Sequence, residues 1–295
     1  MNSIDIESKK FLGQPKNFVS IFNALLFDGK QVLKPEYLKD ENSELVMNVS
    51  SKHVDIIKRY EDGTYLDLFV IESQSYVDPS MVARVMEYES VARMRYIRQN
   101  FKKHVPMHTR LPMILTVVLY VGESKWNAAK RLSELEIIHP GFEDMFNEFK
   151  LNLIELNTNH KYNTGEKATQ DFFDLLRMIY RKQILKEDLD REFNRDALYF
   201  AYVVTKNKEL LNIYQESEKG DVKVCRALDE MFEESTNKGI QMGIKQGIKQ
   251  GIEQGIALNQ FEVYQTMLDK GFSVKDIASI FSVSEESIKK LLMKA

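Results

Sequence analysis

The pattern of hydrophobic and polar positions changes character along the chain. Up to about residue 185, short apolar runs alternate with helical patterns, as in domains that combine strands and helices. Residues 186–235 carry only helical patterns with mixed charge, and 236–258 repeat glycine and isoleucine every four residues. We therefore expect an α/β domain over 1–185, a helical extension over 186–235, the repeat as a helix or linker over 236–258, and a small helical end over 259–295.

A hairpin is the clearest local prediction. Two apolar runs, at 54–60 and 65–71, flank the pair Asp62-Gly63. An Asp-Gly pair between two such runs is a strong short-range signal for a two-residue hairpin loop. A further short strand is expected at 45–49, just before the hairpin.

That hairpin brings candidate chemistry together. With a two-residue loop, Asp55 lies opposite Val70, and Glu72 lies on the same face, diagonally adjacent at about 7–8 Å between Cα atoms. Gln74 has the same parity if the strand extends that far. Two acids on an apolar strand pair are costly unless something compensates their charge. Mg²⁺, which prefers hard oxygen ligands, could do so; the alternative is a solvated strand end where both acids pair with lysines.

Two further residues, Trp126 and Cys225, are expected to pack in the interior of the protein.

Other patterns complete the order of helices and strands expected for an α/β domain. The expected elements are a helix over 18–27 ended by Asp28-Gly29, a helix from Asp78-Pro79 to about 103, a strand buried on both faces from 113, a strand over 151–156 and a helix over 168–181.

The helix after residue 78 carries a basic stripe. At 100° per residue, five of its residues fall within about 80° of one another. No acid occurs between Glu89 and Glu123, whereas six Lys or Arg residues fall within 93–110. Such a stripe is either a solvated outer face or a surface that follows a phosphate backbone, with Tyr88 stacking on a base. The five candidate DNA-binding residues are Arg84, Tyr88, Arg95, Arg98 and Lys102.

The segment around the hairpin resembles the active-site region of the PD-(D/E)XK nuclease superfamily and, more narrowly, the Rpn (putative transposase) family of recombination-promoting nucleases. Asp55 matches the first acid, and Glu72-Ser73-Gln74-Ser75 matches the E-x-Q-S form of the second half-motif. The following helix matches at Asp78, Met81, Arg84 and Tyr88. The resemblance covers roughly residues 11–185.

The resemblance implies a fold and a site. The fold is an αβββαβ restriction-endonuclease-like core, a mixed sheet flanked by helices. Asp55 and Glu72 would hold Mg²⁺, with Mn²⁺ as an alternative ion, and the backbone carbonyl of Ser73 would add a ligand. Gln74 stands where most of the superfamily has lysine, so it would orient water or phosphate without supplying a charge.

Composition limits the classes of function. The formal net charge is −3, so any contact with nucleic acid must come from a local basic patch. The single cysteine excludes internal disulfides and fits a reducing compartment. The N-terminus lacks the apolar core of a signal peptide, and no run approaches 18 apolar residues. We expect a cytoplasmic protein with no membrane partner.

The C-terminal segments favour association. As a helix, the five Gly-Ile pairs from Gly239 to Ile256 would cost on the order of 4–5 kcal/mol relative to alanine. The repeat is therefore either a flexible linker or a helix stabilised by homo-oligomerisation. Residues 259–295 resemble a helix-turn-helix unit, with Ser273 and Ser284 as caps. Its expected core is Ile277, Ala278, Val283 and Ile288.

Together these patterns predict a Mg²⁺-dependent DNA endonuclease of the Rpn type that hydrolyses phosphodiester bonds and carries a self-associating helical tail. Asp55, Glu72 and Gln74 are the predicted catalytic residues. The alternative is a catalytically inactive DNA-binding or assembly protein that keeps the nuclease fold.

Overall fold

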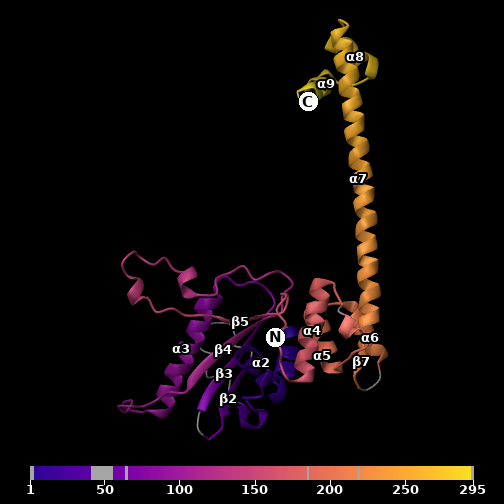
Figure 1. Ribbon diagram of the computed structural model, residues 1–295. Helices are drawn as coiled ribbons and strands as arrows, with labels where there is room; N and C mark the ends of the chain where they lie inside the picture. The colour runs from indigo at the N-terminus through magenta and orange to yellow at the C-terminus, as the bar shows by residue number, and fades with distance from the viewer. Residues whose placement is uncertain (1–2, 41–55, 64–65, 185, 218–219, 294–295) are drawn as a thin grey trace. The chain divides into compact units, whose positions relative to one another are not determined.

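The computed structural model describes residues 3–40, 56–63, 66–184, 186–217 and 220–293 (Figure 1). The chain divides into two compact units, Met1–Asp229 and Glu230–Ala295. The boundary expected at 185 is not a boundary between units, because the helical extension packs within the first unit. Phe11 and Phe200 show this directly, since their rings stack with centroids 4.9 Å apart.

Helices and strands alternate up to about residue 185, as the sequence pattern predicts. The extension after it, expected to be purely helical, also contains two short strands that pair antiparallel. In chain order the elements of the first unit are α1 (Ser3–Leu12), α2 (Pro15–Phe27), η1 (Pro35–Tyr37), β1 (Leu38–Asp40), β2 (Ile56–Glu61), β3 (Leu66–Gln74), α3 (Met81–Asn100), β4 (Met113–Tyr120), η3 (Leu132–Glu134), η4 (Glu143–Met145), β5 (Asn152–Glu155), α4 (Lys167–Arg181), η5 (Lys186–Asp188), β6 (Glu192–Phe193), α5 (Arg195–Thr205), α6 (Lys208–Glu216) and β7 (Val222–Lys223). The long helix α7 (Cys225–Asp269) leads into α8 (Val274–Phe281) and α9 (Glu285–Leu292).

A five-stranded mixed sheet forms the centre of the first unit. Its strand order is β1-β2-β3-β4-β5. β1, β2 and β3 pair antiparallel, whereas β3, β4 and β5 pair parallel. The expectation of a mixed sheet flanked by helices is therefore confirmed. The strand expected at 45–49 lies outside the described residues, and β1 was not predicted.

Helices cover both faces of this sheet (Figure 1). On one face, Leu68 and Val70 of β3 pack against Tyr88 and Ala92 of α3. On the other face, the ring of Phe69 lies 4.7 Å from that of Phe22 in α2. Because side chains alternate along a strand, Glu72 and Gln74 belong to the α3 face, together with Leu68 and Val70.

The predicted register of the hairpin is wrong by two residues. Ile57, not Asp55, lies opposite Val70, and Glu61 pairs with Leu66, so four residues connect the strands. A shift of one residue would turn the apolar side chains outward, but a shift of two keeps every side chain on its face. The hydrophobic pattern therefore could not distinguish the two registers. Gly63, at φ 91°, does occupy the turn conformation that the Asp-Gly signal predicted.

Several local predictions are confirmed. Asp28, at φ 51°, and Gly29, at φ 78°, end α2 in the left-handed conformation. Trp126 is buried and contacts the ring of Tyr120 edge to face at 5.1 Å. Cys225 is buried, and burial raises the pKa of its thiol to about 11, so it is a packing residue.

Among the described residues, no helix is both long and apolar enough to cross a bilayer.

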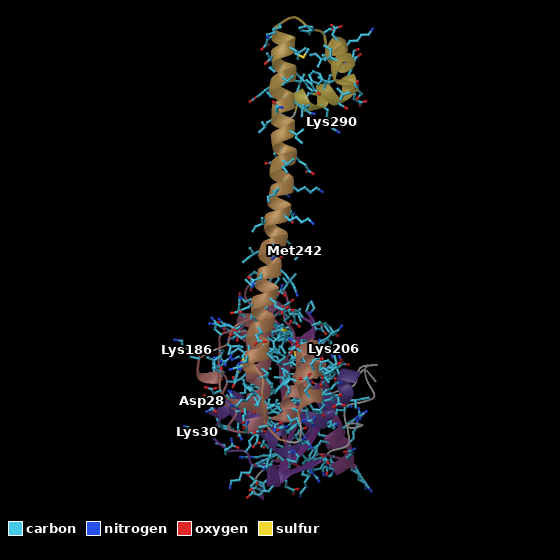
Figure 2. The ribbon with its side chains drawn as sticks, turned by 90° about the vertical axis from the view of Figure 1, so that its right-hand side faces the viewer. Asp28, Lys30, Lys186, Lys206, Met242 and Lys290 are labelled. Carbon is cyan, nitrogen blue, oxygen red and sulfur yellow. The ribbon has the colours of Figure 1, made fainter. Side chains whose placement is uncertain are left out.

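The second unit is helical throughout its described part. The Gly-Ile repeat lies within α7, a single helix of 45 residues, rather than in a flexible linker. Side chains such as Met242 stand outward along this helix (Figure 2). Ser273 forms a capping box with Asp276, and Ser284 caps α9, as predicted. The small core differs from the prediction in two residues: Tyr264 of α7 is buried in it, whereas Val283 is exposed.

Candidate functional site

The predicted site lies where three parallel strands end. Gln74 of β3 is in register with Tyr120 of β4, which is in register with Glu155 of β5. Glu72 precedes Gln74 by two residues on the same face. In open α/β sheets, ligands bind in the crevice outside the carboxyl ends of the strands. Glu72 and Gln74 therefore lie at the edge of the sheet to which this general rule points.

Glu72 is held by a buried ion-pair network. The Arg84 guanidinium, at the start of α3, donates to Glu72 Oε1 at 2.9 Å and to Asp78 Oδ2 at 2.6 Å. It also donates to the hydroxyl of Tyr88 at 2.8 Å and 3.1 Å. Ser80 completes the network, since its backbone N–H and hydroxyl both donate to Asp78 Oδ1. Both carboxylates are buried, so the single guanidinium fixes both side chains.

The pKa directions agree with this geometry. Burial alone would raise the pKa of Asp78, but the hydrogen bonds from Ser80 and Arg84 outweigh it and lower the pKa. Burial alone would lower the pKa of Arg84, yet Asp78, Tyr88 and Glu72 raise it above its ordinary value. Burial, followed by the charge of Glu72, raises the pKa of Tyr88. Arg84 therefore stays cationic, Asp78 stays anionic and Tyr88 stays neutral over the whole physiological range.

Gln74 carries an unused donor. Its side chain is buried, at 4% exposure, and its backbone carbonyl accepts from the N–H of Val121 at 2.9 Å. Within the described part of the chain, no acceptor lies within hydrogen-bond distance of its Nε2. A buried donor without a partner costs about 1–3 kcal/mol, and such groups are rare in folded proteins. This amide is therefore suited to bind an acceptor that the described residues do not provide.

Of the other two predicted metal ligands, the structure describes Ser73 but not Asp55. Ser73 lies in β3 opposite Leu119 and is partly buried. Asp55 lies outside the described residues; in sequence it directly precedes Ile56, the first residue of β2, which pairs with Ile71. Over the ranges that the structure describes, no three Asp, Glu, His or Cys side chains gather closely enough to hold a metal ion. A metal centre here therefore needs a ligand from outside the described residues, and Asp55 is the predicted one.

Only part of the predicted DNA-binding stripe lies on the protein surface. Arg95 is half-buried and Arg98 and Lys102 are exposed, but Arg84 is engaged in the ion-pair network and Tyr88 is buried in the core. The expectation that Tyr88 stacks on a base is therefore wrong, because the sheet covers its ring. Lys102 lies beyond the end of α3 at Asn100, so it does not continue the helical stripe. The helical projection could not show that the first two residues face the sheet.

Sequence reasoning missed the neighbours of this site on β4 and β5. Glu155 is buried at the end of β5 and forms an ion pair with Lys130. Burial, followed by the charge of Glu155, raises the pKa of Tyr120. An acid at the end of an apolar run was the available signal, because Glu72 has the same setting on β3.

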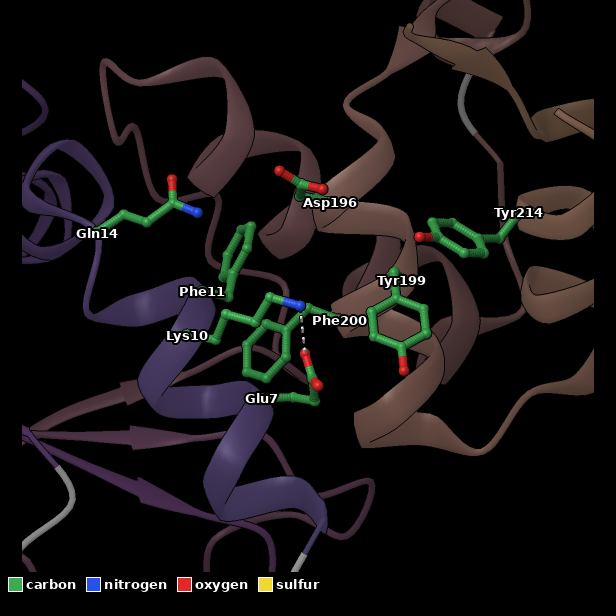
Figure 3. Close-up of a pocket in the computed structure, with 8 residues that line it drawn as sticks. All are labelled: Glu7, Lys10, Phe11, Gln14, Asp196, Tyr199, Phe200 and Tyr214. Atoms are coloured by element: carbon green, nitrogen blue, oxygen red, sulfur yellow. Dashed lines mark ion pairs between the residues drawn. The ribbon is translucent and has the colours of Figure 1, made fainter. Parts of the chain in front are cut away.

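A separate open pocket lies between α1, α5 and α6 (Figure 3). Its volume is about 290 Å³, and Phe11, Phe200 and Tyr199 form much of its aromatic lining. Lys10 and Glu7 pair across its edge at 3.7 Å. None of the predicted site residues lines it, so it does not belong to the Glu72 site.

Comparison with models of known protein families identifies the family of this chain. The model of the family described as "Putative transposase, YhgA-like" matches residues 9–210. The chain belongs to this family. The YhgA-like match spans α2, the whole sheet, α3, α4 and α5, and it includes both Glu72 and Gln74. Searches of curated proteins and of solved structures found no match.

Proposed function

We propose that this YhgA-like family member is a Mg²⁺-dependent DNA endonuclease with a PD-(D/E)XK-like site at Asp55, Glu72 and Gln74. The observation that carries the proposal is Gln74, a buried amide whose Nε2 has no acceptor among the described residues. It lies two residues beyond a buried carboxylate on the same strand face. Family membership supports chemistry on DNA. The coarse fold, a mixed sheet between helices with the site at the strand ends, is compatible with the nuclease core.

The charges of the site suit a divalent cation. Glu72 and Asp78 place two buried carboxylates beside Arg84 at the strand end. Asp55 would add a third acid, and a divalent cation would compensate acids gathered in this way. Carboxylate and carbonyl oxygens, here from Asp55, Glu72 and the Ser73 backbone, are the donors that Mg²⁺ prefers. Mn²⁺ is expected to substitute for it.

Each residue then has a role in hydrolysis. When bound, the metal would supply a Lewis acid and an activated water. Arg84 and Asp78 fix the rotamer of Glu72, so that one carboxylate oxygen keeps its place throughout turnover. The amide of Gln74 would donate to a non-bridging oxygen of the scissile phosphate or to the attacking water. The exposed cations Arg98 and Lys102, with Arg95, would neutralise backbone phosphates farther along the DNA.

Replacing Gln74 by alanine tests the proposed role of its donor. Cleavage should fall by about 10²–10³-fold, the usual loss when one preorganised donor is removed. The Mg²⁺ concentration that gives half-maximal activity should change little, because the amide does not hold the metal. Plasmid cleavage rates measured across a Mg²⁺ titration check both expectations. Unchanged turnover in Gln74→Ala would reduce Gln74 to a packing residue.

We also propose that the chain forms homo-oligomers through α7. The five isoleucines of the repeat, from Ile240 to Ile256, are each 53–58% exposed, and the described residues place no heavy atom within 4 Å of a Cβ added at Gly239–Gly255. One exposed isoleucine is ordinary, but a regular row of five is an apolar stripe. A repeat of four residues exceeds 3.6 per turn, so the stripe winds around the helix and favours right-handed pairing.

A triple substitution in the full-length chain tests this association. Ile244→Gln, Ile248→Gln and Ile252→Gln together should lower the mass of the oligomer in light scattering, because each buried isoleucine contributes about 1.5–3 kcal/mol. Met242→Gln is the matched control, since Met242 is also exposed but lies about 160° around the helix from Ile240 and Ile244. If wild type and the triple variant have the same mass at tens of micromolar, the repeat does not mediate association.

A further inference from the structure

An apolar, acidic arm projects from the first unit between β4 and β5. We define the arm as residues 132–149. Its base is closed by the bridge between Arg131 and Lys150 and by the backbone hydrogen bond from Leu132 to Phe149. Near the base, Leu132 is buried against the α3 face of the sheet.

Contacts among its own residues, both beside its base and at its tip, hold the arm in shape. Ser133 donates to Glu148 through both its backbone N–H and its hydroxyl. The N–H of Gly141 donates to Glu143 at 2.9 Å, and His139 and Phe142 make an edge-to-face contact at 5.3 Å. These contacts give the tip a defined surface.

That surface exposes large apolar side chains. Ile137 is fully exposed, and Met145 and Phe142 are 77% and 55% exposed. Leu135 is 41% exposed. Exposed patches of large apolar side chains mark interaction sites when polar groups rim them. Here the rim is acidic: residues 132–149 contain five Asp or Glu and no Lys or Arg.

The same chain carries a surface with the opposite charge and matching apolar residues. We define the basic surface as residues 93–113. It contains six Lys or Arg and no acid. It also exposes apolar side chains, with Met107 at 86% and Met113 at 52%. The arm and the basic surface leave opposite ends of β4 (Figure 1).

We propose that the arm of one copy docks on the basic surface of a second copy. Charge complementarity selects this occupant, because a surface with five acids repels nucleic acid and attracts a basic surface. The exposed apolar side chains on both sides would be buried in the same contact. In a two-fold dimer the contact occurs twice, since each copy contributes one arm and one basic surface.

The docking would also regulate access to DNA. The cations of the basic surface include Arg95, Arg98 and Lys102, which are the residues proposed to contact phosphates. A docked arm would therefore occupy the place of the DNA backbone. This regulatory consequence rests on the proposed function, whereas the docking itself does not.

Cross-linking between two differently tagged full-length variants tests the docking. One copy carries Met145→Cys on the arm and the other carries Met107→Cys on the basic surface; native Cys225 is buried and will not react. We expect a mixed cross-linked dimer in several-fold excess over the same experiment with Lys30→Cys, an exposed site elsewhere in the unit. Association through α7 does not depend on the charges of the arm, so charge-reversed variants separate it from docking of the arm.

Charge reversal makes the test specific. Adding Glu134→Lys, Glu136→Lys and Glu143→Lys to the arm should remove the excess, and adding Arg98→Glu, Lys102→Glu and Arg110→Glu to the other copy should restore it. Equal yields with Met107→Cys and Lys30→Cys, or an excess that survives reversal of the arm alone, would overturn the docking. Excess duplex DNA should compete with the cross-link; a specific cross-link insensitive to DNA would support docking and contradict the proposed DNA surface.

Discussion

Replacing Glu72 by glutamine is expected to lower Mg²⁺-dependent DNA cleavage by more than 100-fold. Changes to residues that only orient a metal ligand usually cost 10–100-fold in activity or metal affinity, so loss of a ligand's charge should cost at least as much. Glutamine keeps the size of the side chain and can still accept a hydrogen bond from Arg84. The fold should therefore survive, which circular dichroism and thermal melting can verify.

Glu87→Gln is the matched control for this prediction. It removes the same charge from a half-buried residue of α3. Within the described part of the chain Glu87 forms no hydrogen bond or ion pair with Glu72, Asp78 or Arg84, and its charge acts only on Tyr88. Cleavage by this variant should stay close to that of the wild type. If Glu72→Gln cleaves DNA as fast as Glu87→Gln, Glu72 is not a metal ligand and the ion-pair network is purely structural.

Replacing Arg191 by methionine is expected to lower the free energy of unfolding of the first unit by about 3–5 kcal/mol. Arg191 forms ion pairs with three buried carboxylates, those of Asp171, Asp174 and Asp188. Burial alone would lower its pKa, but Asp174 and Asp171 raise it, so the guanidinium is charged at all accessible pH. Methionine fills similar space but leaves the three buried carboxylates without their shared cation.

Urea denaturation of full-length protein measures this effect on the unit that contains Arg191. The matched control is Arg226→Met, which changes an exposed arginine and should alter the free energy of unfolding by no more than about 0.5 kcal/mol. Equal midpoints for the two variants would mean that Lys167 and Arg177 suffice to compensate the carboxylates. In that case the ion pairs of Arg191 would not contribute to holding α4 against residues 188–191.

The sequence was most informative where burial imposes a periodicity. The run of β4, buried on both faces, and the helical pattern of α2 were predictable because each pattern allows one kind of element. The hairpin register was not predictable, because registers two residues apart bury the same side chains. Only the residues of the turn could distinguish the two registers. The Asp62-Gly63 pair predicted a two-residue loop, whereas four residues connect Glu61 to Leu66.

The sequence predicted which residues of β3 share a face at the candidate site, but it did not predict their contacts. The parity of Glu72 and Gln74 follows from the strand, and the strand does extend to Gln74. The pairing of Arg84 with both Glu72 and Asp78 depends on how α3 lies across the sheet, which no local pattern contains. For the same reason, helical projection assigned Arg84 and Tyr88 to a DNA-binding surface when they point to the sheet.

Direct cleavage of supercoiled plasmid tests the central claim. Wild-type protein should nick or linearise the plasmid in the presence of Mg²⁺, and EDTA should abolish this activity. Asp55→Ala, which removes the predicted first acid, should be inactive in Mg²⁺ while retaining the melting temperature of the wild type to within a few degrees. Cleavage by Asp55→Ala at the wild-type rate, or cleavage by the wild type that persists in EDTA, would contradict the proposed metal site.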